Sequence, residues 1–541
     1  MKKFLAIILA LTMLLGVASA VAESTTSSET LEMQKALIDA AKALPKSENL
    51  YFENGLEISG MGVHYNNYPT EFDGCYYFPA IQALTGAKIV VDWRVEDNYS
   101  TQVATTLASN NLPDILQAGA YGVMNLVGEG AIVPLDEYLD LIPNVVAAVG
   151  EDRMANWRQP DGHIYTIPTI VNVPGSQSVM VRQDWLDALN MEIPETWDQW
   201  VELWRAIKAN DLNGNGDPND EIPLALEQGA NGERSMASLL NAFGIRASSD
   251  CQFCVLDDGT YTMVYEHPRY KEFLQAVQDL YKEGLIDPEF ATRTQAELFT
   301  AMDSNLVGTT MTWAERAKLS TYANREGGDE DALWTCVTPI DGPYGDQMTQ
   351  ERNAVTSLWC ITTAAEKAGK VEDILKLFNW NFSDEGNKLY NYGIEGVSYD
   401  MVNGEAVLKP VMVANGFVDY RLIGCEYEPF GGAWQTSAFM QCLFAGKTTD
   451  DLDDASASFY NGLAIVNNGH FYAMPQTLET EAYVEYRAEL ITTGVCVLRD
   501  QAVAGQLTVD EFFTKYEALK AQGLQDVIDE GAAAYALLSG N

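Results

Sequence analysis

The stretch "DLNGNGDPNDEIPL", residues 211 to 224, alternates acidic and amide side chains with glycines, which is the chemistry of a calcium loop. Calcium takes about six to eight oxygen ligands, and an EF-hand loop supplies them from alternate positions, with a glycine at position 6 for the sharp turn. Counted from Asp211, Asn213 and Asn215 stand at positions 3 and 5, Gly216 at position 6 and the Asp217 carbonyl at position 7. The first half of the stretch therefore matches the pattern.

The second half departs from the pattern by one residue. Position 12 is Ile222 rather than Glu, and the closing acids Asp220 and Glu221 come at positions 10 and 11. A closing carboxylate can still arrive along a shorter path; the alternative is a turn without metal, because Asn, Asp and Gly also serve sharp turns. We expect a structural calcium site, since a sensor would need a pair of helices that can open. Its predicted ligands are Asp211, Asn213, Asn215, Asp217, Asp220 and Glu221.

The sequence lacks the motifs of the common catalytic sites. The histidines at positions 64, 163, 267 and 470 are scattered and form no HExxH pair, and no GxSxG nucleophile elbow occurs. "AGKTT" at 445 to 449 resembles the tail of a P-loop, but Gln441 stands where the first glycine belongs, and "GMG" at 60 to 62 lacks the third glycine of a dinucleotide fingerprint. The pair Cys251 and Cys254 has no zinc-binding partners nearby, so a local disulfide or two buried thiols explains it better. We expect a protein that is not an enzyme.

The length of the chain and the periodicity of its apolar residues predict the lobes, helices and strands that position a binding site. The chain has 541 residues, beyond the roughly 250 to 300 at which single hydrophobic cores stop growing, so at least two lobes are expected. From Leu56, strand and helix patterns alternate through "LEISGMGVHY", "FPAIQALTG", "KIVVDWRV", "YSTQVATTLASNN" and "PDILQAG", which predicts a parallel βαβ sheet. Ligands of such sheets lie beyond the carboxyl ends of the strands. This makes the loops 64–71 and 117–121 candidate ligand walls, with the candidate residues Tyr65, Asn66, Glu71 and Tyr121.

Residues 163–189 are predicted to carry the chain across into a second lobe. "HIYTIPTIVNVPGSQSVMVRQDWLDAL" holds two β-rich stretches before a helix, as expected for a chain that crosses between lobes. In "PETWDQWVELWRAIKAN", Thr196 and Gln199 form a capping box, and the tryptophans fall on one helix face, where a role in the core is favoured over a role as sugar platforms. Near the end of the chain, Thr508 and Glu511 form another capping box, and Gly523 predicts a helix stop.

The N-terminus and the charge indicate the compartment. "MKKFLAIILALTMLLGVASAVAES" has a basic start, an apolar run and small residues suited to cleavage after Ala20 or Ala22, which predicts a signal peptide and a secreted or periplasmic, soluble chain. The first cysteine is Cys75, so a lipid anchor through an N-terminal cysteine is not expected. The formal net charge of -44 disfavours binding to nucleic acid or to anionic membranes, because both need clustered Lys and Arg.

Several segments lie in the order of one known family. They are "NNLPDIL" (110–116), "VRQDWLDAL" with "PETWDQW" (181–200), the stretch at 211 to 224, "LVGTTMTWAE" (306–315), "LKLFNWNFSDEGNKLYNYGIEGVSYD" (375–400) and the closing "GQLTVDEFFTKYEALKAQGL". Together they resemble the family 1 extracellular solute-binding proteins of ABC importers, in the branch with lipoprotein-type and alginate-oligosaccharide-binding members. In this branch the loop at 211–221 is similar to a structural calcium site, which leaves open whether Asn219 or Asp220 coordinates.

The resemblance implies an α/β, two-lobed periplasmic-binding-protein-like fold of type II, with crossing strands and a central ligand cleft that closes by hinge motion. The expected crossings lie near 166–182, 357–365 and 405–412. We expect a signal peptide at 1–22, a linker and helix at 23–50, an N-terminal lobe from 51–170 plus 360–410, and a C-terminal lobe from 171–359 plus 411–541 that contains the calcium loop.

The resemblance also implies ligand-binding residues. Trp313 looks like the cleft tryptophan of the family, and Trp434 stands where a second aromatic residue often lies, so that their faces can stack on sugar rings. Arg182, Glu315 and Arg316 could hydrogen-bond hydroxyls or a uronate carboxylate. The alternatives are that Arg182 simply pairs with Asp184 and that Trp313 belongs to the core.

The implied function is capture of a small oligosaccharide, including one that contains uronic acid, by a monomer that delivers it to the permease subunits of an ABC transporter. A secreted carbohydrate-active enzyme is the main alternative, since two carboxylates suffice for glycoside hydrolysis and 77 acidic residues cannot exclude such a pair. A peptide-binding protein is another, because one fold supports many ligands. A secreted structural protein fits poorly with βαβ alternation.

Overall fold

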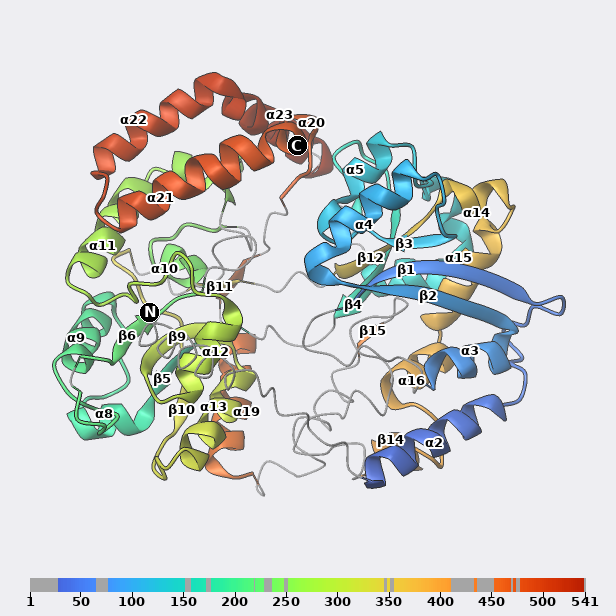
Figure 1. Cartoon of the computed structure of the whole chain (residues 1–541), viewed down its shortest axis with the longest axis horizontal. Coiled ribbons are helices and arrows are strands. Elements are labelled where there is room, and N and C mark those ends of the chain that lie inside the picture. Colours follow the sequence, from blue (N-terminus) through green and yellow to red (C-terminus); the bar gives the residue numbers. More distant parts are fainter. Residues whose placement is uncertain are drawn as a thin grey trace, which may run out of the picture.

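The computed structural model places two α/β lobes side by side (Figure 1). Among the described helices, none combines the length and the hydropathy that crossing a bilayer requires. The leader predicted at residues 1–22 lies outside the described part of the chain. The structure describes residues 28–64, 76–150, 157–171, 177–217, 219–227, 236–247, 252–344, 348–350, 355–409, 433–434, 452–468, 470–472 and 477–539.

The first lobe is built on a mixed sheet with the strand order β15-β4-β12-β3-β1-β2. Strands β1, β2 and β3 are mutually parallel along their pairings, as the βαβ pattern predicts, while β12 runs antiparallel to both β3 and β4. Strand β15 pairs with β4 in parallel. The strands are β1 (Leu56–His64), β2 (Ala87–Val95), β3 (Ile115–Gln117), β4 (Thr166–Val171), β12 (Val355–Ile361) and β15 (Ala433–Trp434).

Helices cover both faces of this sheet, and each face has its own apolar core. One core joins Ile58, Ile115 and Trp359 of the strands to buried side chains of helices on one face. The other joins Met61, Leu116 and Cys360 to helices on the opposite face. The helices of the first face include α2 (Ser28–Lys42), α3 (Tyr77–Thr85), α6 (Pro143–Val149), α15 (Val371–Asn381) and α16 (Asp384–Tyr392); those of the second are α4 (Glu96–Ala108) and α5 (Val123–Gly128).

The second lobe has a sheet with the strand order β10-β5-β9-β6. Strand β5 runs antiparallel to both of its neighbours, β10 and β9, whereas β6 is parallel to β9. The strands are β5 (Gln177–Arg182), β6 (Ile222–Ala225), β9 (Val307–Trp313) and β10 (Trp334–Val337). The helices around them include α8 (Gln183–Leu189), α9 (Trp197–Lys208), α10 (Met236–Ala242), α11 (Tyr270–Lys282), α12 (Gln295–Asp303), α13 (Glu315–Glu326) and α19 (Asp454–Asn468).

Local signals in the sequence set the helices of this lobe. The capping box of Thr196 and Gln199 starts α9 as predicted, and Trp200 and Trp204 are fully buried in the core. The Trp204 indole N–H donates to the Thr309 hydroxyl of β9 at 2.9 Å, which ties the helix to the sheet.

The C-terminal helices also follow their local signals. The second predicted capping box, Thr508 with Glu511, starts α22 (Val509–Leu519), and Gly523 separates it from α23 (Gln525–Ser539) with φ +133. Such a φ costs a glycine little, because it has no Cβ.

The boundaries between lobes differ from those expected. The whole of β12 pairs within the first sheet, so the chain has returned to the first lobe by Val355 rather than by 360. Residues 433–434 also pair with β4 in the first sheet, although 411–541 were expected in the second lobe. Contact of α19 with β10 places the chain in the second lobe again after Asp454. Sheet membership of such short segments depends on long-range pairing, which the local pattern does not encode.

Arg182 is an internal anchor of the second lobe rather than a ligand contact, which corrects the role expected from the sequence. Its side chain is fully buried, and its guanidinium donates to Asp184 at 2.9 and 2.5 Å, to Asp329 at 2.8 Å and to the Asn305 side chain. The guanidinium carbon also lies 4.8 Å from the centre of the Trp185 ring. The alternative pairing with Asp184 is therefore confirmed.

Replacing Arg182 by Met should destabilise the chain by about 3 kcal/mol, because it strips two partly buried carboxylates of their shared cation. Urea unfolding of the purified chain measures the loss. The matched control is Arg94→Met, which breaks a surface pair with Asp92 whose side chains are 43% and 56% exposed and should cost less than about 1 kcal/mol. Equal, small effects of the two substitutions would contradict the anchoring role.

Candidate functional site

The connection from β4 to β5 brings one edge of each sheet together. Strand β4 ends at Val171 in the first lobe and β5 begins at Gln177 in the second, and six residue steps of extended chain span at most about 20 Å. The first edge consists of the strand ends on the Val171 side: His64, Val95, Gln117, Val171, Val355 and Trp434. The second edge consists of the strand ends on the Gln177 side: Gln177, Ala225, Trp313 and Val337.

Interlocking polar contacts fix the first edge. The Gln117 side-chain oxygen accepts a hydrogen bond from the backbone N–H of Val63 at 2.6 Å. The Tyr99 hydroxyl donates to the Gln117 carbonyl at 2.7 Å and lies 3.2 Å from the Met61 carbonyl. Sequence analysis did not identify Gln117 or Tyr99 as positioning residues. Their hydrogen-bond partners lie on strands that only the pairing of the sheet brings next to them.

Tyr121 lies where the strand-end rule predicted, in the turn Gly119–Tyr121 directly after β3. Its side chain is half-buried. Burial, followed by the charge of Glu129, raises the pKa of Tyr121, so the hydroxyl keeps its proton and can donate a hydrogen bond. The other predicted residues of this edge, Tyr65, Asn66 and Glu71, lie outside the described residues.

The two glycines near the end of β1 are explained by side-chain packing and not by nucleotide binding. A Cβ on Gly62 would stand 2.6 Å from the Trp93 ring of β2, and one on Gly60 would stand 3.1 Å from the Ile115 and Val91 side chains. The ring of Trp93 meets that of Trp359 edge to face, with their centroids 6.3 Å apart. The "GMG" motif therefore makes room for the aromatic pair next to the first edge.

Trp313 is the last residue of β9 and lies on the second edge, half-buried, opposite Gln177 of β5. Glu315 follows as the first residue of α13. The Arg316 guanidinium donates to Asp303 of α12 at 2.5 Å and to the Ser320 hydroxyl at 2.9 Å, and its carbon lies 4.3 Å from the centre of the Phe299 ring. The Arg316 side chain is therefore bound by residues of its own lobe.

Trp434 reaches the first edge through the pairing of β15 with Val171 of β4. Trp434 and Trp313 therefore belong to the two edges that the β4–β5 connection joins. Arg182 lies at the opposite end of β5, since Gln177 pairs with Trp313 while Arg182 pairs with Trp334 at the far end of the sheet.

The predicted calcium loop folds back on itself at that far end, directly before β6. The buried Glu221 carboxylate accepts the backbone N–H of Leu212 at 2.7 Å through Oε1, and its Oε2 is buried with no hydrogen-bond partner. The Asp220 carboxylate accepts hydrogen bonds from the side-chain amides of Asn213, at 3.1 Å, and Asn215, at 2.5 Å.

The remaining predicted ligands of the loop, Asp211 and Asp217, are both exposed. The Asp211 carboxylate accepts the Gly216 N–H at 2.9 Å. In the described ranges, which include residues 211–217 and 219–221 of this loop, no three His, Cys, Asp or Glu side chains are grouped closely enough to hold a metal. The nearby CxxC is described only at Cys254, a buried thiol whose pKa burial raises to about 12.

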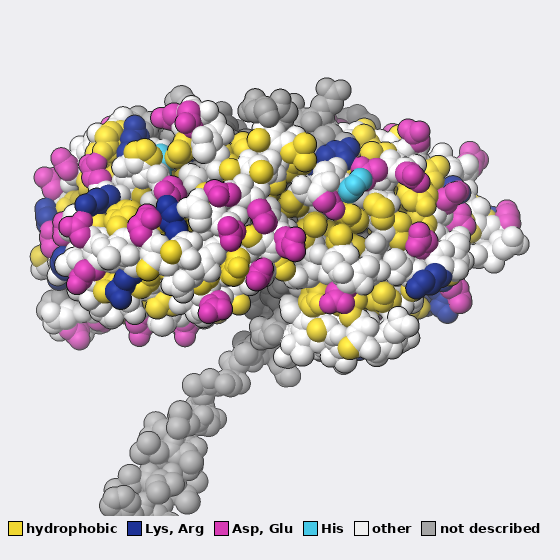
Figure 2. Space-filling view, turned by 90° about the horizontal axis from the view of Figure 1, so that it is seen from above, with side chains coloured by type: hydrophobic (Ala, Val, Ile, Leu, Met, Phe, Trp, Pro, Cys, Tyr) yellow, Lys and Arg dark blue, Asp and Glu magenta, His cyan; other side chains and the backbone are white. Residues whose placement is uncertain are grey.

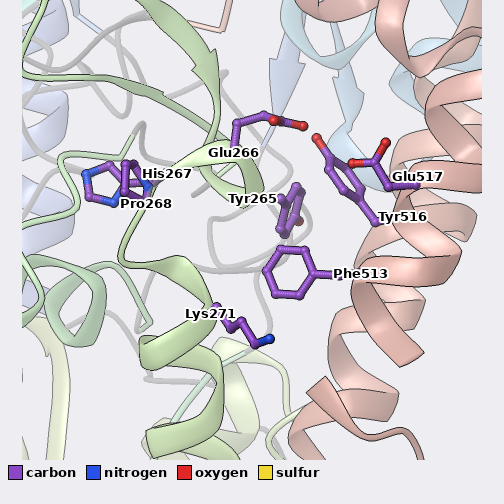
Figure 3. A pocket seen from close by; sticks show the side chains of 8 residues that line it. All are labelled: Tyr265, Glu266, His267, Pro268, Lys271, Phe513, Tyr516 and Glu517. Carbon is purple, nitrogen blue, oxygen red and sulfur yellow. The ribbon is translucent and has the colours of Figure 1, made fainter. Parts of the chain in front are cut away.

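A separate surface pocket of about 230 Å³ lies between the start of α11 and α22 (Figure 3). Tyr265, Phe513 and Tyr516 form its aromatic wall, and the Tyr516 hydroxyl points toward Glu266. Lys520 lies 2.9 Å from Glu266, so the acid of this pocket already has a cation. The pocket is built from second-lobe residues alone and does not include either sheet edge.

Two curated relatives align with the chain. It is 28% identical over 280 residues to the fructooligosaccharide ABC transporter substrate-binding protein FusA of Streptococcus pneumoniae serotype 4, across 49% of this chain and 50% of that protein, so the match spans half of FusA. It is 22% identical over 358 residues to the polygalacturonan/rhamnogalacturonan-binding protein YtcQ of Bacillus subtilis, across 64% of this chain and 68% of that protein.

Solved structures share the fold. Alginate-binding protein AlgQ2, determined without calcium ion, matches with a TM-score of 0.70 and 22% identity over 91% of this chain and 100% of that one. An EF-hand mutant of S. pneumoniae FusA in complex with fructo-nystose matches with a TM-score of 0.67 and 20% identity over 90% and 100%. At these identities the likeness establishes the two-lobed architecture. Because residues 76–388 also match the family directly, the chain belongs to the bacterial extracellular solute-binding proteins.

Proposed function

We propose that this chain is the extracellular solute-binding component of an ABC transporter and captures a small oligosaccharide between its two lobes. The observation that carries the proposal is the pair of strand edges joined by the β4–β5 connection, with a tryptophan at the end of a strand on each edge. The names of FusA and YtcQ, which specify oligosaccharide and polysaccharide ligands, support this class of ligand. Membrane permease subunits and a cytoplasmic ATPase would be the partners.

Capture would work by stabilising one arrangement of the lobes. A sugar ring has apolar C–H faces that stack on an aromatic ring, and the half-buried Trp313 offers such a surface. The protonated hydroxyl of Tyr121 and the carboxylate of Glu315 would hydrogen-bond sugar hydroxyls from opposite lobes. A ligand that touches both edges binds the closed arrangement better than the open one, and this difference in affinity is what shifts the population.

The charges favour a neutral oligosaccharide over one held by arginine. Of the two arginines expected to bind a uronate, Arg182 is buried at the far end of its sheet and Arg316 is paired with Asp303. Acidic side chains spread over the visible face of both lobes (Figure 2), and the net charge of -44 opposes anionic ligands in general. The same charge opposes nucleic acid as a partner.

A thermal-unfolding screen tests the proposal. Neutral fructo-oligosaccharides, uronic-acid oligosaccharides and peptides are added separately to the purified chain, and a ligand that binds only the folded state raises the unfolding midpoint by mass action. We expect a neutral oligosaccharide to raise it. Trp313→Ala should weaken that binding by about tenfold or more, because an aromatic contact adds about 0.5–1.5 kcal/mol beyond its buried area.

Trp313→Phe is the matched control, since it keeps an aromatic face and should retain most of the affinity measured by calorimetry. Unchanged affinity in Trp313→Ala would remove this residue from the site. A midpoint raised by peptides alone would replace the sugar with a peptide. Recovery of cleaved glycan after incubation would replace the binding protein with a carbohydrate-active enzyme.

We also propose that the loop at 211–221 holds a structural calcium ion. The residues suit the ion because the buried Oε2 of Glu221 has no hydrogen-bond partner and because Asp211, Asn213, Asn215 and Asp220 carry further side-chain oxygens in the same hydrogen-bonded loop. Asp211, Asn213, Asn215, Asp220 and Glu221 would supply side-chain oxygens, and Asp217 its carbonyl. Calcium there would fix the connection from α9 to β6 and take no part in ligand contact.

Atomic absorption on chelator-free protein should find calcium, and adding a chelator should lower the unfolding midpoint. Calcium at 100 times its dissociation constant would stabilise the fold by about 2.7 kcal/mol. Glu221→Gln should lose most of this stabilisation, whereas Asp258→Asn, in an exposed acidic turn of the same lobe, should keep it. A chain that binds no calcium at millimolar concentration would show that the loop is a turn without metal.

A further inference from the structure

A carboxylate of the second lobe reaches the first lobe just after the turn that follows β3. Glu479 follows Leu478, which is buried in the core of the second lobe, and its Oε2 accepts the backbone N–H of Met124 at 3.4 Å. Met124 belongs to α5 of the first lobe, and Glu479 lies just before α20 (Glu481–Tyr486) of the second. Figure 1 shows α5 and α20 as neighbouring helices of the two lobes.

The first lobe makes room for this carboxylate with a glycine. Gly122 is buried and has φ +91, and a Cβ there would stand 2.8 Å from Oε2 and 3.0 Å from Oε1 of Glu479. Another residue at this position would be strained by its φ and would displace the carboxylate. The backbone of the first lobe is therefore shaped to let Glu479 approach closely.

Hydrogen bonds within the second lobe fix the backbone on the C-terminal side of Glu479. The next residue, Thr480, caps α20 by accepting the Tyr483 N–H on its hydroxyl, and the Ala482 N–H donates to the Glu530 carboxylate of α23 at 2.8 Å. The segment that presents Glu479 is thus tied to two helices of its own lobe. Because the backbone next to Glu479 is already fixed, only its side chain must be ordered when it meets the other lobe, so more of the contact energy is retained.

We propose that Glu479 is an interlobe latch, a positioning residue whose contact with Gly122 and Met124 stabilises the arrangement in which the lobes are together. The proposal rests on the proposed function, since a latch matters for a protein that opens to take up and release its ligand. It adds a determinant of the open-to-closed ratio that acts between the lobes themselves, beside Tyr121 of the first edge. A contact made in only one arrangement shifts that ratio by its own free energy.

The test compares the ligand-free chain with Glu479→Gln, Glu479→Ala and the control Glu481→Ala, which removes an exposed carboxylate two residues away. Small-angle X-ray scattering measures the radius of gyration, and hydrogen exchange measures protection of the backbone amides at 122–128. We expect Glu479→Ala, which removes the acceptor, to raise the open-to-closed ratio about threefold to tenfold, the effect of losing one net hydrogen bond. Glu479→Gln keeps an uncharged acceptor oxygen and should raise the ratio by a smaller factor, because only the charge of the contact is lost. The radius of gyration of both variants should grow and exchange at 122–128 should speed up, while Glu481→Ala stays like the wild type.

A wild-type radius of gyration and wild-type exchange in both Glu479 variants would overturn the latch. Faster exchange throughout the second lobe without a change in radius would also overturn it, because Glu479 would then stabilise only its own lobe. The nearly isosteric Glu479→Gln keeps the test valid if the alanine variant folds poorly. Since no ligand is added, a failed sugar screen would count against the proposed function and leave this result standing.

Discussion

The short connection between β4 and β5 is the constraint on which the rest of the molecule depends. It joins two separate sheets through the residues between Val171 and Gln177, so these two strand ends must stay within about 20 Å of each other. Residues at these ends can touch one ligand from two lobes. Residues at the opposite ends of the strands cannot, whatever their chemistry.

This constraint divides the polar groups of the second lobe into two kinds. At its far end, Arg182 pairs with Asp184 and Asp329, and the loop before β6 closes on the Glu221 carboxylate. At the edge near the first lobe, Trp313 ends its strand half-buried. If the proposed function is correct, stability and recognition depend on opposite ends of the same four strands.

Local features of the fold could be predicted from the sequence because their causes are local. The βαβ alternation from Leu56 gave the parallel core of the first sheet, and the capping boxes at Thr196 and Thr508 start helices where expected. The strand-end rule placed Tyr121 correctly beyond β3. Arg182 was misjudged because β5 runs antiparallel to β9, and the direction of a strand within its sheet is not written in its own residues. Trp434 was assigned to the wrong lobe for another reason: its partner strand β4 is remote in the sequence, and the local pattern does not encode such long-range pairing.

The most direct test is a crystal structure of the chain with the oligosaccharide that most raises its unfolding midpoint. Capture between the lobes predicts a sugar ring stacked on Trp313, with further contacts from the first edge beside Gln117 and Tyr121. A sugar bound only in the outer pocket beside Tyr265 and Tyr516, with the strand edges empty, would contradict the proposed site.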